Sequence, residues 1–226
     1  NKMIDGSPRI DVNQALMTDL FDQVEELYGE EIAQFIVAYR INGATNVEPL
    51  EATGIDDGTT TGNSRMDQVI EDVAEEVVEG MFSGEGTTTT RAGMDLTQPA
   101  SVQIESLYEL VDAEVEAEID GVTETLISPW NSSSGDLMTS LPELFQNFST
   151  SSVEYIDGRI NINQARLEVM LGIPDMPEEL ARTILSQRPV DSEGQPLPQM
   201  TEMQASTGWV LIQGYADVTM MRRLDR

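Results

Sequence analysis

An internal repeat constrains the fold of this chain more than any other feature of its sequence. Residues 9–15 read Arg-Ile-Asp-Val-Asn-Gln-Ala, and residues 159–165 read Arg-Ile-Asn-Ile-Asn-Gln-Ala. Further along each copy, a pair of glutamates precedes an alanine, an isoleucine and an arginine: Ala33, Ile36 and Arg40, then Ala181, Ile184 and Arg188. Because these residues are three and then four positions apart, they share one face of a helix in each copy.

Each copy therefore predicts two helices joined by a tight turn. Asn13 and Asn163 stand just before apolar-periodic stretches. An asparagine side chain there can accept backbone N–H groups of the first helical turn, so both residues are predicted N-caps. The alternating segment before each asparagine predicts a short strand or bridge. In the second copy the turn covers residues 171–177, and Pro177 suits the first position of the next helix.

The region that follows the first copy predicts loops around one helix. Residues 44–63 and 83–100 are rich in threonine and glycine, which is typical of loops. Between them, apolar residues recur at helical spacing over residues 65–81, and acidic residues fall on the other face. This pattern predicts an amphipathic helix within an insertion of residues 44–100.

A β-hairpin is predicted next. Residues 113–119 alternate strictly between apolar residues and glutamate, as in a half-buried strand with one acidic face. Asp120 and Gly121 form a typical hairpin turn, so residues 122–127 are the predicted partner strand.

Two helices are predicted in the C-terminal half. Residues 136–148 carry leucine and phenylalanine at the spacing of an amphipathic helix. Asp217 is the predicted cap of a last helix that ends in Arg222 and Arg223. Two cations suit the negative end of a helix dipole, which gives both arginines a structural role.

The composition excludes several classes of chemistry. The 226 residues include 41 acidic and 12 basic side chains, for a net charge of -29, and neither histidine nor cysteine. Ser-His-Asp and Cys-His nucleophiles, zinc sites with histidine or cysteine ligands, iron–sulfur clusters and disulfides are therefore impossible. Paired carboxylates are too common in such a chain to indicate a catalytic site, so we expect no enzymatic activity.

Calcium is the one cofactor that the residues of this chain favour. Ca²⁺ prefers carboxylate and amide oxygens with glycine at sharp turns. Asp56, Asp57 and Asn63 supply such oxygens around Gly58, without the register of an EF-hand. These residues are the candidate metal ligands.

The repeat resembles a helix-hairpin-helix unit. The second copy has Asn-Ile-Asn-x-Ala at residues 161–165, an Ile-Pro turn, Glu-Leu-Ala-x-x-Ile at residues 179–184 and the closing Arg188. Two such units with a long insertion are similar to the type II secretion system protein K family, the large minor pseudopilins. Other matching features are Trp209, Ser128-Pro129 and the segments 106–112, 141–144 and 221–224. The resemblance covers residues 9–43 and 101–226.

The resemblance implies a non-enzymatic structural component of a pseudopilus. Its partners would be other minor pseudopilins and secreted substrate. It would lie on the periplasmic face of the inner membrane, anchored by an N-terminal hydrophobic helix that is missing here, and further pilin-like strands would lie outside the chain. A protein-interaction module of another envelope assembly is the alternative.

Binding of nucleic acid is disfavoured, although helix-hairpin-helix units are common in DNA-binding proteins. Their Gly-x-Gly hairpin lets backbone N–H groups approach a phosphate. The corresponding positions are Leu27 and Gly29 in the first copy and Asp175 and Pro177 in the second. Asp175 adds a negative charge and Pro177 removes an N–H donor. We therefore expect no nucleic-acid partner.

The sequence thus predicts a mainly helical α+β fold, with duplicated helix-hairpin-helix (SAM-like) units and an inserted region that carries a small sheet or hairpin. The predicted segments are the first repeat at 9–43, the insertion at 44–100, a small α+β segment at 101–158, and the second repeat with C-terminal helices at 159–226.

Overall fold

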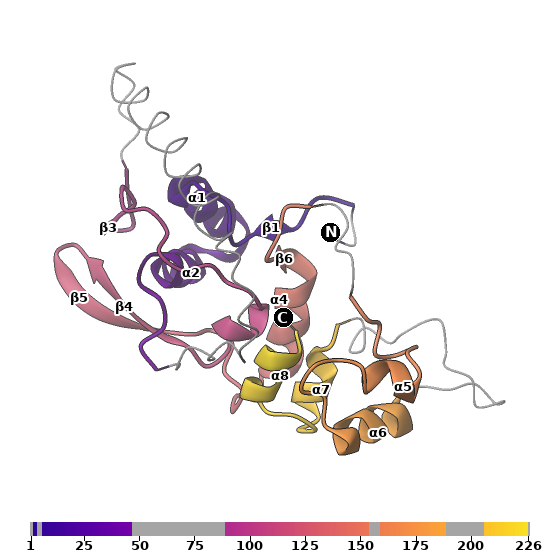
Figure 1. The fold of residues 1–226 in the computed structure, drawn as a ribbon. Coiled ribbons are helices and arrows are strands. Elements are labelled where there is room, and N and C mark those ends of the chain that lie inside the picture. Colours follow the sequence, from indigo (N-terminus) through magenta and orange to yellow (C-terminus); the bar gives the residue numbers. More distant parts are fainter. Residues whose placement is uncertain (1, 4–5, 47–88, 154–158, 189–205, 226) are drawn as a thin grey trace, which may run out of the picture. The chain divides into compact units, whose positions relative to one another are not determined.

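A computed structural model describes residues 2–3, 6–46, 89–153, 159–188 and 206–225 (Figure 1). The fold is α+β, with helices and small two-stranded sheets. The chain divides into two compact units. The first-repeat unit comprises residues 13–103 and 113–127, and the second-repeat unit comprises residues 1–12, 104–112 and 128–226. Each unit thus draws on several of the segments predicted along the chain.

Two helices form the centre of the first-repeat unit. Helix α1 (Met17–Tyr28) and helix α2 (Glu30–Asn42) pack against each other and are joined by Gly29 alone. The φ of Gly29 is 86°, a conformation that favours glycine, which explains how the chain turns within one residue. Helix α1 buries one apolar stripe, whereas α2 is buried on nearly all sides from Ala33 to Ile41. An all-round apolar helix is typical of a core.

The predicted hairpin is confirmed in the same unit. Strand β4 (Glu114–Ile119) pairs antiparallel with β5 (Val122–Ile127), with Ile119 opposite Val122. Asp120 and Gly121 between them have φ values of 52° and 78°, as in a type I′ turn. The glutamates of β4 are exposed, Val115 and Ala117 are buried, and the strand packs against α2, which agrees with the predicted division of its two faces.

An ion pair ties a second, smaller sheet to α1. Strands β2 (Thr90–Arg91) and β3 (Met94–Asp95) pair antiparallel. The Arg91 guanidinium donates from Nε to Asp22 Oδ1 at 2.6 Å and from Nη2 to Asp22 Oδ2 at 3.0 Å. Hydrogen bonding by Arg91 lowers the pKa of the Asp22 carboxyl.

The second-repeat unit is built around a short helix and an amphipathic one. The 3₁₀ helix η1 (Leu107–Leu110) is fully buried, and helix α4 (Leu137–Asn147) buries its leucine and phenylalanine stripe. Strand β1 (Ile10–Asp11) pairs in parallel with β6 (Phe148–Ser149), which follows α4 directly. The bounds of α4 confirm the helix predicted over residues 136–148.

Four further helices complete this unit. They are α5 (Leu167–Met170), α6 (Glu178–Gln187), α7 (Gly208–Ile212) and α8 (Val218–Leu224). Helix α7 packs on α4, and α8 packs on η1. The Asp217 side chain accepts a hydrogen bond from the Met220 N–H at 2.7 Å, which confirms it as the N-cap of α8.

The predicted N-caps are wrong in both copies of the repeat. Helix α1 begins at Met17 and α5 at Leu167, so each helix starts four residues after its asparagine. In the second copy the Asn161 side chain accepts the Asn163 N–H at 3.0 Å, and this local turn occupies the residues that were expected to begin the helix. In the first copy, Val12 and Asn13 turn the chain as it leaves β1.

Three smaller expectations have different outcomes. The short strand expected before Asn13 is confirmed as β1, but residues 159–163 contain no strand. Pro177 is the N-cap residue of α6 and not its first helical residue. The helix predicted over residues 65–81 lies outside the described residues.

The hairpin turn yields a stability prediction. Replacing Gly121 with alanine places a Cβ on a backbone with φ near 78°. We expect Gly121→Ala to lower the free energy of unfolding by about 1–2 kcal/mol. The matched control is Gly135→Ala, at a glycine without positive φ and with open space around its Cβ position, which should change stability by less than about 1 kcal/mol. Chemical denaturation followed by circular dichroism measures both, and equal effects would contradict the assigned turn.

Candidate functional site

The closing arginine of each repeat binds the segment that precedes the first helix of its own copy. Arg40 is 6% exposed, and its guanidinium donates to the carbonyl oxygens of Val102 and Asn13. Arg188 donates from Nη1 to the carbonyl oxygen of Ala165 at 2.7 Å. The two arginines therefore have comparable structural roles.

The other predicted repeat residues are structural as well. Ala33 and Ala181 are both fully buried, which explains why a small side chain occupies this position in each helix. Asn13 meets Arg40 through its backbone oxygen, whereas Asn163 is 5% exposed and its copy's arginine binds Ala165 instead.

The two copies differ in their first helix and in their hairpin. Helix α1 has 12 residues, but α5 has only 4. In the second copy the hairpin is longer, and its positive φ falls on Asp175, at 59°, and not on the position equivalent to Gly29. Since α5 is so short, less of its own copy is available to cover the apolar face of α6.

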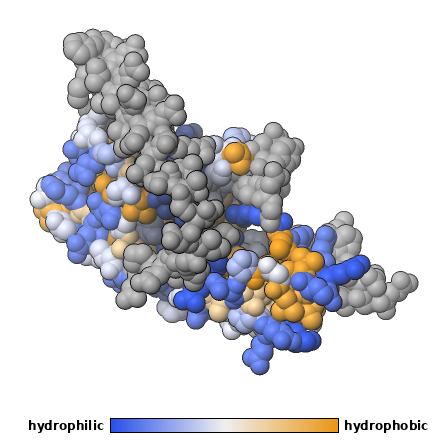
Figure 2. Space-filling view, in the orientation of Figure 1, coloured by the Kyte–Doolittle hydropathy of each residue, from blue (hydrophilic) through white to orange (hydrophobic). Residues whose placement is uncertain are grey.

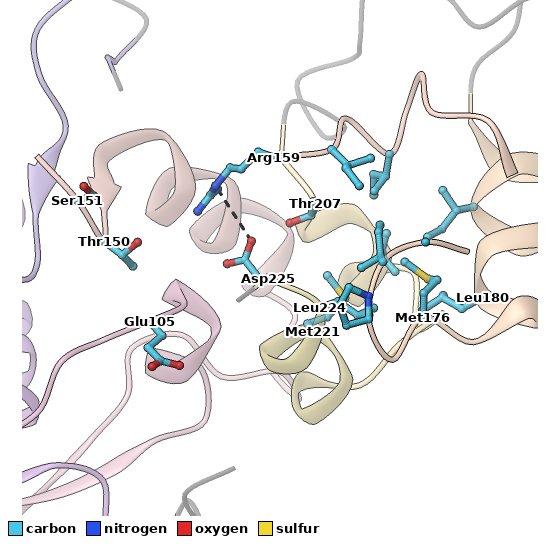
Figure 3. Close-up of a pocket in the computed structure, with 17 residues that line it drawn as sticks. Glu105, Thr150, Ser151, Arg159, Met176, Leu180, Thr207, Met221, Leu224 and Asp225 are labelled. Carbon is cyan, nitrogen blue, oxygen red and sulfur yellow. Dashed lines mark ion pairs between the residues drawn. The ribbon is translucent and has the colours of Figure 1, made fainter. Parts of the chain in front are cut away.

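An open pocket lies beside α6 in the second-repeat unit (Figure 3). Its volume is about 490 Å³, within the range of ligand sites. We call it the α6 pocket. Its apolar wall combines α6, α7, α8 and the chain before α6, and includes Ile162, Met176, Leu180, Ile184, Val210 and Met221. Ile184 belongs to the repeated alanine–isoleucine–arginine face, so the repeat contributes directly to this wall.

One end of the α6 pocket is polar. Asp225 Oδ2 accepts a hydrogen bond from the Ser106 hydroxyl at 2.8 Å, and Asp225 Oδ1 lies 3.9 Å from Nη1 of Arg159. The Asp225 side chain is 13% exposed, and that of Arg159 is 53% exposed. Burial raises the pKa of the Asp225 carboxyl, and the hydrogen bond from Ser106 and the charge of Arg159 oppose this rise. Glu105 also lines this end.

The position of Asp225 depends on a buried arginine in α8. Arg222 donates from Nε to the Tyr108 carbonyl oxygen at 3.0 Å and from Nη2 to the Val111 carbonyl oxygen at 2.6 Å. These bonds fix α8 against η1. The dipole role predicted for Arg222 is therefore incomplete, because this side chain is 8% exposed and binds η1 and the residue after it. The sequence signal that could have predicted this buried role is the position of Arg222 directly after the apolar residues of α8.

Two hydroxyls next to the polar end, those of Ser106 and Tyr108, have structural roles. Ser106 is fully buried, and its Oγ also accepts the Tyr108 N–H at 3.2 Å as the cap of η1. The Tyr108 hydroxyl shares a hydrogen bond of 2.7 Å with Thr207 Oγ1, and burial raises the Tyr108 pKa. Neither Ser106 nor Tyr108 is placed to attack a ligand.

An exposed apolar surface adjoins the pocket. Ile160, Val169 and Leu171 are 37%, 47% and 42% exposed, and we call these three residues the α5 surface. Figure 2 shows hydrophobic side chains gathered in this part of the molecule, at the right of the view. Ile160 also lines the pocket, as do Gly172 and Ile173, which follow Leu171 in the sequence.

The candidate calcium ligands Asp56, Asp57 and Asn63 lie outside the described residues, and the calcium site stays a prediction. Within the described ranges, no group of three or more acidic side chains is placed to hold a metal ion. Nor does this part of the chain contain a helix with the length and apolar character needed to cross a membrane.

The two closing arginines yield a paired prediction. Methionine keeps the apolar stem of arginine but removes its donors. We expect Arg40→Met to cost about 2–4 kcal/mol, because it leaves two carbonyl groups without a buried cationic donor. Arg188→Met removes one hydrogen bond at a half-buried site and should cost about 1 kcal/mol. Urea denaturation of the two variants measures the difference, and a larger cost for Arg188→Met would contradict these roles.

Asp225 yields a prediction with a defined pH dependence. Burial raises the pKa of Asp225 in the folded chain, so folding favours the protonated carboxyl over the carboxylate. The stability that the protonated form contributes is fully present at low pH and is lost as pH rises through the folded pKa. Asp225→Asn should therefore raise the melting temperature at pH 7, and the gain should shrink as pH falls toward the ordinary aspartate value of 3.8.

The matched control is Asp217→Asn, at the exposed N-cap of the same helix. It removes the same charge, and asparagine caps as well as aspartate, so the melting temperature should hardly change. Thermal melts at several pH values measure both variants. A melting temperature for Asp225→Asn below that of the unchanged chain at pH 7 would contradict the buried, disfavoured carboxylate.

Comparison with known proteins gives no relative for this chain. No protein-family model, no curated protein and no solved structure matches it.

Proposed function

We propose that this chain is a non-enzymatic structural component of a type II secretion pseudopilus, a protein-K-like minor pseudopilin that assembles with other pseudopilins. The observation that carries the interaction part of the proposal is the α5 surface beside the α6 pocket, three exposed apolar side chains on a chain with a net charge of -29. Apolar areas that stay exposed on otherwise polar proteins mark interaction sites.

The repeat supports the family part of this proposal. In both copies the second helix begins at the first of two glutamates, at Glu30 and Glu178, and the closing arginine binds the segment before the first helix. This agreement in geometry is what two diverged helix-hairpin-helix units of one ancestor would share. The proposed location is the periplasmic face of the inner membrane, where secreted substrate is a further partner.

The environment of Ser106, the hydroxyl that bonds Asp225, supports a role without catalysis at this serine. Its buried carboxylate is held by a serine that is itself buried and engaged as a helix cap. A general base must reach the proton that it removes, and a nucleophile must reach its substrate. The fully buried Ser106 meets neither condition.

A protein-interaction module of another envelope assembly is the second candidate, because the same apolar area would serve it equally well. The repeat favours the pseudopilin. Nucleic-acid binding is the weakest candidate, since Asp175 at the second hairpin is exposed and the net charge is strongly negative.

Co-expression with the minor pseudopilins of the same secretion system tests the proposal. We expect the chain to co-purify with at least one of them. A double variant, Val169→Glu with Leu171→Glu, should reduce the recovered partner, because it places charges on the α5 surface. The control is Val122→Glu, at a residue of β5 that is 59% exposed in the other unit.

Recovery of a pseudopilin with the control variant but not with the double variant supports both the function and the surface. If no minor pseudopilin is recovered with the unchanged chain, the proposed function is wrong, and the second candidate replaces it.

A further inference from the structure

The α6 pocket has an apolar wall and a polar end. Its wall is apolar over α6, α7 and α8, and its end carries the carboxylates of Asp225 and Glu105 (Figure 3). A ligand that fills such a space has an apolar body and a polar group at one end. Sites of this kind use the apolar wall for affinity and the few polar groups for orientation.

The polar end favours a cation that can donate hydrogen bonds. Ser106 occupies Asp225 Oδ2, but the nearest described cation to Asp225 Oδ1 is Arg159 at 3.9 Å, beyond hydrogen-bond distance. Arg159 is itself 53% exposed, so an incoming ammonium or guanidinium group can displace it toward solvent. Glu105 adds a second negative charge on the same side of the pocket.

The charge of the whole chain points in the same direction. A net charge of -29 attracts basic partners and repels acidic ones before contact is made. An anionic ligand could meet Arg159, but it would also face Asp225 and Glu105, and like charges at such a distance disfavour binding.

The apolar area extends beyond what a small molecule would cover. Ile160 lines the pocket and is itself exposed, and the exposed Leu171 directly precedes Gly172 and Ile173 of the pocket lining. A membrane is a poor match, since surfaces that bind bilayers carry lysine and arginine around their apolar residues. A segment of a protein can fill the pocket and cover the α5 surface at once.

We propose that the α6 pocket and the α5 surface bind an amphipathic segment of a partner protein, whose apolar side chains pack on the wall and whose lysine or arginine pairs with Asp225 and Glu105. The inference rests on the proposed function in that the partner is a protein of the same assembly.

Two synthetic peptides with one apolar face test this proposal on the full chain. Both are helical and carry leucines on that face, and one ends in arginines where the other ends in glutamates. Fluorescence anisotropy of the labelled peptides measures binding. We expect the arginine peptide to bind at least about tenfold more tightly than the glutamate peptide.

Variants of the chain then assign the site. Asp225→Asn should weaken binding of the arginine peptide about tenfold, and Glu105→Gln, at an exposed residue, should weaken it less. Glu105→Gln keeps the test valid if Asp225→Asn disturbs the fold. Ile160→Glu should weaken both peptides, whereas the control Val122→Glu should weaken neither.

Three results would overturn the proposal: equal binding of the two peptides, no weakening by either carboxylate variant, or binding of the chain to phosphatidylcholine vesicles that Ile160→Glu abolishes. The last result would assign the surface to a membrane. Failure of this proposal differs from failure of the function. If pseudopilins co-purify but the arginine peptide does not bind, only the pocket assignment falls, and if the peptide binds but no pseudopilin co-purifies, only the function falls.

Discussion

Arginine side chains that donate to backbone carbonyl groups hold together segments that are far apart in this sequence. In the first-repeat unit, Arg40 joins the end of α2 to Asn13 and Val102. In the second-repeat unit, Arg222 joins α8 to Tyr108 and Val111, more than 100 residues earlier. A guanidinium group suits this role because it presents several donors in a fixed plane and satisfies carbonyl oxygens that are buried away from water. The contacts of Arg222 and the hydrogen bond from Ser106 to Asp225 together hold α8 and the residue after it at the pocket.

Two of the few basic side chains in this chain form these buried backbone contacts. The chain has 12 basic side chains and 41 acidic ones. Arg40 and Arg222 are nevertheless buried, and both donate to backbone carbonyl groups. Most described carboxylates lie instead on exposed helix and strand faces, as those of β4 do. Asp225 is an exception, a carboxylate held in low solvent exposure at the edge of an apolar wall. Removing the Asp225 carboxylate from water costs free energy, and a bound cationic group would offset that cost.

Local patterns in the sequence were sufficient for several elements and misleading for others. The alternation at residues 113–119 and the turn at Asp120-Gly121 predicted the hairpin, because both depend on neighbouring residues alone. The cap prediction at Asn163 was wrong because the Asn161 side chain binds the backbone before α5 begins. The one at Asn13 was wrong because this residue lies in a turn after β1 and α1 begins only at Met17. The α6 pocket could not be predicted, because Glu105, Arg159 and Asp225 approach one another only through tertiary packing.

The two copies of the repeat differ in what surrounds their second helix. In the first copy, a long α1 lies along α2, and Ala33 and Ile36 are completely buried between the elements of their unit. In the second copy, α5 is a single turn, and the equivalent face of α6 meets α7 and α8 across the pocket. With this short α5, the closing arginine Arg188 still binds the chain before the first helix of its copy. The two copies thus agree in the second helix and its closing arginine and differ in the first helix, and the copy with the short first helix is the one that lines the α6 pocket.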